Sequence, residues 1–179
     1  MYKTFKKEFK NCNIRFDQKI LIAVSGGIDS VVLSKLFSLA KFNFGIAHVN
    51  FSLRGEESLA DEVFVKKFAK TLKVPYHTIC FDTNAFAKQE KISTQMAARI
   101  LRYQWFEEIR IQEGYDFIAT GHHQLDSAET MLINLVRGTG IAGFHGIPIK
   151  SGHLIRPLSF ASQDAIFDFV VANKLAWRE

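Results

Sequence analysis

The chain has 179 residues, a net charge of +5 and an isoelectric point near 9.2. This size favours one domain, and 47% hydrophobic against 23% charged residues is typical of a globular protein. The chain has no apolar run of bilayer length, no apolar core in its first stretch (MYKTFKKEFKNC) and no CxxC pair between Cys12 and Cys80. These features argue against a membrane protein, a secreted protein and a disulfide framework. We therefore expect a cytoplasmic protein whose basic charge permits an anionic partner.

Apolar strand-like runs alternate with helical periodicity along the chain, which predicts an α/β domain with a doubly wound parallel sheet of about five strands. The predicted strands cover 19–24, 44–49, 76–81, 116–120 and a shorter run near 154–156. The predicted helices cover 30–41, 57–72, 93–113, 124–137 and 162–174. In open α/β sheets, ligands bind along the carboxyl edge of the strands. The loops at 25–30, 50–56 and 121–126 should therefore surround a site.

Residues 1–18 are predicted to form a helical extension with two distinct faces. An apolar face carries Tyr2, Phe5, Phe9 and Cys12. A basic face carries Lys3, Lys6, Lys7 and Lys10. The apolar face should pack on the domain, while the basic face is either solvated or a stripe for nucleic-acid phosphates.

The stretch ILIAVSGGIDS (20–30) ends a predicted strand in a loop of small residues and then opens a helix. Two glycines let backbone amides approach a ligand, and a helix N-terminus favours phosphate. Ser25 and Ser30 add hydroxyl donors, and Asp29 can hold a phosphate-bound Mg²⁺. Two other interpretations stay open: a plain turn capped by Asp29, and a nucleophile elbow with Ser25 as the nucleophile. The loop is not a Walker A motif, because no lysine follows Gly27.

Two acids lie near the start of the helix predicted at 124–137. Asp126 and Glu129 are three residues apart, so both carboxylates can lie at the strand edge and join Asp29 around Mg²⁺-ATP. The same spacing imitates a capping box, a role compatible with the first. His122 is expected near the substrate, and no third ligand at suitable spacing supports a zinc site.

Several basic and polar residues are candidates for phosphate or base contacts. Arg99 and Arg102 share one face of the helix predicted at 93–113 and suit phosphate neutralisation. A solvated face paired with Glu107 or Glu108 is the alternative, and the pattern slightly favours it for Arg102. Asn50 can contact a nucleobase edge and Arg54 can pair with phosphate, and a polar loop before a helix is the alternative. Arg137 opens a glycine-rich stretch that is either a surface near the phosphates or a simple mobile loop.

The motif SGGIDS resembles the pyrophosphate loop of the ATP pyrophosphatases, here in its expected place between a first strand and a helix. Further stretches resemble the tRNA(Ile)-lysidine synthetase family, in that family's order. They are HVNFSLRGEESLADEVFVKKFA (48–69), ARILRYQWFEEI (98–109), TGHHQLDSAETMLINLVRGTGIAGFHGIP (120–148), IRPLS (155–159) and the closing LAWRE.

The resemblance implies a PP-loop catalytic domain over 1–179, with the family's tRNA-binding C-terminal domains outside it. It implies an ATP-dependent ligase that adenylates the wobble cytidine of a CAU-anticodon tRNA(Ile) and joins free L-lysine to it. A homodimer is a further expectation. The competing functions are another PP-loop adenylating enzyme, such as a tRNA thiolase or a synthetase, and a non-catalytic nucleotide- or RNA-binding module. A thiolase would be expected to show paired cysteines.

The motifs and the resemblance together give the expected site residues. The nucleotide-binding set is Ser25, Gly26, Gly27, Ile28, Asp29, Ser30, Asn50, Arg54, Gly121 and Arg137. The catalytic set is Asp29, Arg99, Arg102, His122, Asp126 and Glu129, with Asp29 and Asp126 as the Mg²⁺ ligands.

Overall fold

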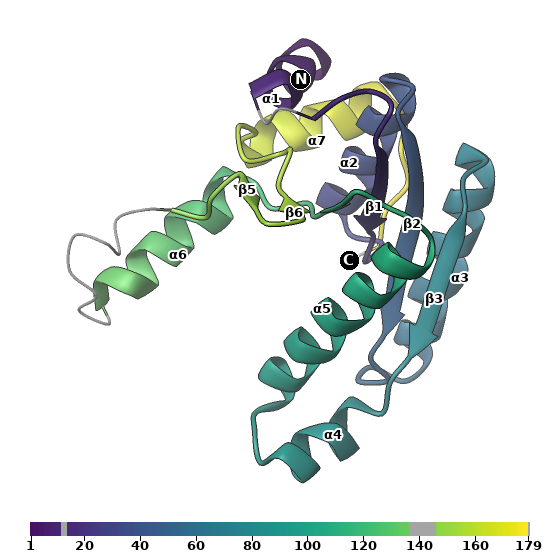
Figure 1. Cartoon of the computed structure of the whole chain (residues 1–179), viewed down its shortest axis with the longest axis vertical. Coiled ribbons are helices and arrows are strands. Elements are labelled where there is room, and N and C mark those ends of the chain that lie inside the picture. The colour runs from purple at the N-terminus through teal and green to yellow at the C-terminus, as the bar shows by residue number, and fades with distance from the viewer. Residues whose placement is uncertain (12–13, 137–145, 179) are drawn as a thin grey trace.

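The computed structural model describes residues 1–11, 14–136 and 146–178 and contains one six-stranded sheet (Figure 1). The strands are β1 (Lys19–Ala23), β2 (Asn43–Asn50), β3 (Tyr76–Cys80), β4 (Phe117–Ala119), β5 (Lys150–Ser151) and β6 (Leu154–Ile155). Their order is β3-β2-β1-β4-β6-β5, and every pair is parallel except β5 with β6. The doubly wound parallel sheet expected from the sequence is confirmed. Because the chain runs from β1 to β3 on one side and then returns to β4 on the other, the switch point lies between β1 and β4.

Helices cover both faces of this sheet. The helices of the described residues are α1 (Tyr2–Asn11), α2 (Ile28–Leu39), α3 (Glu56–Leu72), α4 (Thr83–Glu90), α5 (Thr94–Gln112), α6 (Gln124–Val136) and α7 (Gln163–Ala172). Side chains of β1 alternate between two cores, as the period of a strand requires. Ile20 and Ile22 belong to the core that includes residues of α2, α3 and α7, whereas Leu21 packs in the core that contains Trp105 and Phe106 of α5.

The described residues of the predicted apolar face of the N-terminal helix pack on the domain, as expected, whereas Cys12 lies outside the described residues. Phe5 and Phe9 in α1 are almost fully buried. Their rings contact Phe37 and Phe42, with centroids 5.4 Å apart for Phe5 and Phe37 and 4.5 Å for Phe9 and Phe42. Aromatic pairs at these separations add to the stability that burial alone gives. The helix therefore belongs to the same core as the central sheet.

A close approach between β2 and the segment before β4 depends on a glycine. A Cβ atom at Gly45 would lie 1.9 Å from the hydroxyl oxygen of Tyr115. That tyrosine is buried and lies in hydrogen-bond range of His77 Nε2, at 3.0 Å. Burial raises the pKa of Tyr115 to about 12, so its hydroxyl stays protonated. Only a residue without a side chain fits this position of β2.

Three features of the fold were not predicted from the sequence. The helix α4, capped by Asp82, lies between β3 and α5 where only a loop was expected. The short strand β5 pairs with β6 across a turn at Gly152. The helix α6 has no buried residue and projects away from the sheet (Figure 1). Among the described residues, no helix combines the length and the apolar content that crossing a membrane requires.

Candidate active site

The loop between β1 and α2 presents backbone amides at the carboxyl edge of the sheet. Gly26 adopts a φ of +102°, which few other residues tolerate, and Gly27 is the N-cap residue of α2. The amide of Gly27 donates to Ser25 Oγ at 3.2 Å, and Ser30 Oγ donates to the Gly27 carbonyl at 2.9 Å. Within the described part of the chain, no side chain caps the N-terminus of α2. Its first amides are therefore available to an anion, and Asp29 is not the cap that the plain-turn interpretation required.

The nucleophile-elbow interpretation needs a base beside Ser25. The hydroxyl of Ser25 contacts the Gly27 amide and lies 3.5 Å from Ser30 Oγ. Among the described residues, no histidine hydrogen-bonds Ser25: His48 Nδ1 lies against the Val24 carbonyl and His122 Nδ1 against Thr120 Oγ1. A serine nucleophile works with an adjacent general base. The geometry of this loop therefore favours phosphate binding.

The loop after β4 approaches the start of α2 very closely. A Cβ atom at Gly121 would lie 3.1 Å from the Cβ of Asp29 and 3.2 Å from the Ser30 nitrogen. The next residue, His122, lies with Nδ1 2.8 Å from Thr120 Oγ1. Burial, with the charges of nearby arginines, lowers the pKa of His122, although Asp126 opposes this shift. The imidazole is consequently neutral at physiological pH and able to exchange a proton.

His123 was not among the expected site residues, yet it lies between the two candidate metal ligands. Its Nε2 is 3.7 Å from Asp29 Oδ1 and 3.7 Å from Asp126 Oδ2. Its Nδ1 accepts a hydrogen bond from the amide of Leu125, so the neutral ring carries its proton on Nε2. Asp126 also accepts from the His123 amide at 2.7 Å. The pair of adjacent histidines in the sequence was the signal, but only the fold shows which of them bridges the acids.

A cavity of about 240 Å³ lies at the switch point between β1 and β4. Most of the expected catalytic residues line it together with residues of the phosphate loop. The lining comprises Ala23, Val24, Ser25, Asp29, Ser30, Val49, Phe51, Arg102, Tyr103, Phe106, Thr120, Gly121, His122 and Asp126. The guanidinium of Arg102 stands 5.1 Å from the centre of the Phe51 ring. The site therefore combines backbone amides, two carboxylates, a guanidinium and an imidazole around one space.

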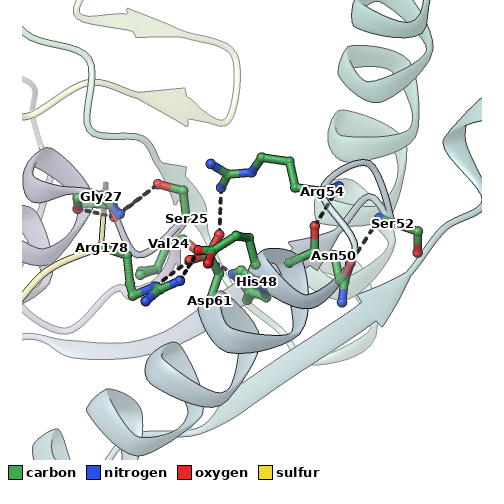
Figure 2. A network of polar contacts seen from close by, with 12 residues as sticks. Val24, Ser25, Gly27, His48, Asn50, Ser52, Arg54, Asp61 and Arg178 are labelled. Carbon is green, nitrogen blue, oxygen red and sulfur yellow. Dashed lines mark hydrogen bonds and ion pairs between the residues drawn. The ribbon is translucent and has the colours of Figure 1, made fainter.

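A second cavity of about 270 Å³ adjoins the first and shares Ser25, Val49, Phe51 and Arg102 with it. Asn50 and Arg54 line it, but both are engaged. Asn50 donates to Glu62. Figure 2 shows that Asn50 also accepts from the Ser52 amide and that Arg54 pairs with Asp61, at 2.7 Å.

His48 also lines this second cavity. Its Nε2 is buried and has no hydrogen-bond partner among the residues that the structure describes, while its Nδ1 lies 2.8 Å from the Val24 carbonyl. That carbonyl can only accept, so Nδ1 carries the proton and Nε2 is an unused acceptor.

Of the remaining expected residues that the structure describes, none lines either cavity. Glu129 is exposed on α6 and lines neither of them. Arg99 is exposed on α5, with its guanidinium 5.1 Å from the ring centre of Tyr103, a cavity residue. Ile28 packs against the core at the start of α2, and Gly26 is buried in the loop. Arg137 lies outside the described residues.

The carboxylates of Asp29 and Asp126 have the chemistry that Mg²⁺ requires. Burial raises the pKa of Asp29, and the charge of Asp126 adds to this effect against the opposing charge of His123. A cation between the two acids would relieve that repulsion. No group of three or more metal-ligating side chains occurs within the described ranges. Two carboxylates fit Mg²⁺ bound jointly with substrate phosphates, because this ion commonly uses one or two carboxylates and retains waters.

The fold and the site define a nucleotide-binding α/β domain with a phosphate loop at its topological switch point. The chain belongs to the PP-loop domain family, whose model matches residues 1–179.

The chain is also similar to proteins named tRNA(Ile)-lysidine synthase. It is 46% identical to that of Bacteroides thetaiotaomicron over 154 residues, covering 86% of this chain and 36% of the relative. It is 40% identical to that of Chlorobaculum tepidum over 187 residues, covering 100% of this chain and 56% of the relative. The chain thus spans well under two thirds of the length of these relatives.

Among solved structures, the U34-tRNA thiolase NcsA from Methanococcus maripaludis, with its [4Fe-4S] cluster, has a TM-score of 0.79 and 20% sequence identity. The match covers 99% of this chain and 64% of the thiolase chain. At this identity the likeness concerns the fold alone.

Proposed function

We propose that this chain is the ATP-binding catalytic domain of a tRNA(Ile)-lysidine-forming ligase. The observation that carries the proposal is the single cavity in which the phosphate loop, Asp29, Asp126 and Arg102 meet. The similarity to lysidine synthases, at 40–46% identity, supports this reaction among those that PP-loop domains perform. The absence of a CxxC pair in the sequence argues against the thiolase alternative.

ATP would lie with its phosphates over the loop at 25–30 and its adenosine in the second cavity. The uncapped amides of α2 and the hydroxyls of Ser25 and Ser30 are donors for the phosphates. In the second cavity, His48 Nε2 is an acceptor that lacks a donor, and the exocyclic amine of adenine supplies one. Burial of an unsatisfied acceptor is costly, so a base that satisfies it gains affinity.

The reaction would proceed in two steps within the first cavity. In the first step the 2-oxygen of the wobble cytidine attacks the α-phosphorus of ATP, and pyrophosphate leaves. In the second step the ε-amine of lysine attacks C2, AMP leaves, and the amine loses a proton. The wobble base must be splayed out of the anticodon loop to reach this cavity, as is usual in sequence-specific RNA recognition.

The chain's own groups have separate roles in these steps. Arg102, assisted by Arg99, neutralises charge that develops at phosphorus. Asp126 and Glu129 are candidates to orient the lysine ammonium, and neutral His122 is suited to accept a proton. Asp29 and Asp126 would hold Mg²⁺, which when bound screens the phosphate charge. The homodimer and the cytoplasmic location stay predictions.

The test is lysine incorporation by the gene product that contains this chain. Radiolabelled lysine, ATP and a CAU-anticodon tRNA(Ile) transcript are incubated with the protein, beside a transcript whose wobble cytidine is replaced by uridine. The proposal expects label in the first tRNA alone. ATP binding without label in either transcript would favour another PP-loop reaction, and no ATP binding would exclude an ATP-dependent function altogether.

A further inference from the structure

The segment after α7 returns to the phosphate loop and is fixed there by Arg178 (Figure 2). The backbone amide of Arg178 donates to the Gly26 carbonyl at 2.9 Å. Its guanidinium pairs with two acids of α3, through Nε to Asp61 at 2.8 Å and through Nη2 to Glu57. One residue thus connects the loop after β1 with the helix that follows β2.

We propose that Arg178 is a positioning residue of the nucleotide site. It would hold the Gly26–Gly27 peptide in its phosphate-binding orientation and, through Asp61, keep Arg54 in the wall of the second cavity. This inference rests on the proposed binding of ATP at the loop. Nothing in the sequence motif LAWRE indicates such a role, because the partners of Arg178 lie 117 and 121 residues away.

The main-chain hydrogen bond acts through the geometry of the peptide. In a trans peptide the carbonyl and the amide of one unit point in opposite directions. The Gly26 carbonyl points to Arg178, so the amide of Gly27 must point away from it, toward Ser25 Oγ, which it contacts at 3.2 Å. Gly26 has a positive φ and little intrinsic preference for this conformation. An external hydrogen bond therefore selects one orientation of the peptide.

The guanidinium acts through a shared carboxylate. The side chain of Asp61 is 8% exposed and has a guanidinium on each oxygen, with Arg178 at Oδ1 and Arg54 at Oδ2. A buried acid between two such groups gives a more defined geometry than an exposed pair, since charge-assisted hydrogen bonds at both oxygens fix its orientation. The side chain of Arg54 is 59% exposed in the folded protein, so its ion pair with Asp61 restrains it beside the cavity.

The test compares Arg178→Met, Arg178→Lys and the matched control Arg15→Met, which removes an exposed ion pair with Asp17 far from these contacts. ATP affinity is measured by calorimetry, and amide hydrogen exchange is measured without nucleotide. We expect Arg178→Met to weaken ATP binding roughly tenfold, Arg178→Lys to restore part of the loss, and Arg15→Met to change nothing. Exchange should rise at residues 25–28 and stay unchanged in β1 and β4.

Each outcome decides between positioning and general stabilisation. Equal ATP affinity in Arg178→Met and the unsubstituted chain would overturn the inference, as would exchange that rises equally throughout the sheet. If Arg178→Met does not fold, the test uses Glu57→Gln, which removes the more exposed of the two acid partners. This variant is expected to weaken ATP binding by a smaller factor. An unchanged ATP affinity would overturn the inference. Failure of the unsubstituted chain to bind ATP would instead overturn the proposed function.

Discussion

The Nε2 atom of His123 lies 3.7 Å from the Oδ1 atom of Asp29, although His123 is in the loop after β4 and Asp29 is in the first turn of α2, which follows β1. His123 lies at the same distance from Asp126, so its imidazole spans the two carboxylates. The ring is almost buried, and the backbone of Leu125 fixes its orientation. The relative placement of the two acids therefore depends on a residue that is not itself an acid or a cavity-lining residue.

Replacing His123 by alanine should weaken the use of Mg²⁺ more than it weakens folding. Without the imidazole, the carboxylates of Asp29 and Asp126 lose their common partner and their orientation. Loss of such a supporting contact typically costs about 10- to 100-fold in metal affinity. Pyrophosphate release measured against Mg²⁺ concentration should show a higher half-saturating concentration. The exposed His153, replaced by alanine, is the control, and equal curves for the two variants would contradict this role of His123.

Replacing Asp29 by asparagine should stabilise the fold at neutral pH when no Mg²⁺ is present. Burial raises the pKa of this carboxyl, aided by Asp126 and opposed by His123. An acid whose pKa is raised on folding destabilises the folded state at pH values above that pKa, and the cost vanishes as pH falls toward the ordinary value. In EDTA, we expect the thermal unfolding midpoint of Asp29→Asn to lie about 2 °C above that of the unsubstituted chain near pH 8, and the difference to disappear near pH 4.

Mg²⁺-ATP should reverse that order of stability. Mg²⁺-ATP is expected to raise the thermal unfolding midpoint of the unsubstituted chain, because a ligand that binds only the folded state stabilises that state. The midpoint of Asp29→Asn should change little. A variant that is less stable than the original at every pH would contradict the raised pKa. A variant that responds fully to Mg²⁺-ATP would contradict the metal role of Asp29.

Gly121→Ala should damage the site while the sheet remains intact. The added Cβ would lie 3.1–3.2 Å from the Asp29 Cβ and from backbone atoms of Asp29 and Ser30, so the start of α2 must shift. A displacement of this kind at the phosphate loop is expected to lower pyrophosphate release about 100-fold. Steady-state kinetics and circular dichroism of the same sample test this, and full activity would show that the close approach has no functional consequence.

Gly45→Ala should have the opposite effect to Gly121→Ala: it should lower the stability of the fold strongly rather than damage the site. The new Cβ would collide with the Tyr115 hydroxyl at 1.9 Å, in a buried region whose two residues line neither cavity. Overpacking of a core typically costs about 1–3 kcal/mol. Urea unfolding should show a lower midpoint with little change in the slope. An unchanged midpoint would mean that Tyr115 moves aside without cost.

The order of strands and helices could be predicted because the hydrophobic periods are clear and glycine loops separate them. The predictions for β1 to β4 and for α2, α3, α5, α6 and α7 were confirmed to within a few residues. The helix α4 was missed because it has only eight residues, and the sequence signal was the cap residue Asp82, which accepts from the Ala85 amide. Such short elements depend on capping and tertiary contacts more than on periodicity.

The convergence of several candidate residues on one cavity was predictable, whereas their contacts were less so. Topology explains much of this convergence, because Ser25 and His122 follow strands, and Asp29 and Asp126 lie in the first turns of helices that begin at the same sheet edge. Arg102 reaches the cavity from α5. The contacts of Arg178, Asn50 and Arg54 depend on distances between segments remote in sequence. No local pattern encodes those distances, and for that reason they appear only in the folded structure.

Cleavage of ATP labelled at the α-phosphate tests the central claim most directly. With the CAU-anticodon tRNA and lysine present, the gene product that contains this chain is predicted to form AMP and pyrophosphate, and Asp126→Asn should slow this about 100-fold or more. Formation of ADP and phosphate, or equal turnover by Asp126→Asn, would contradict the account.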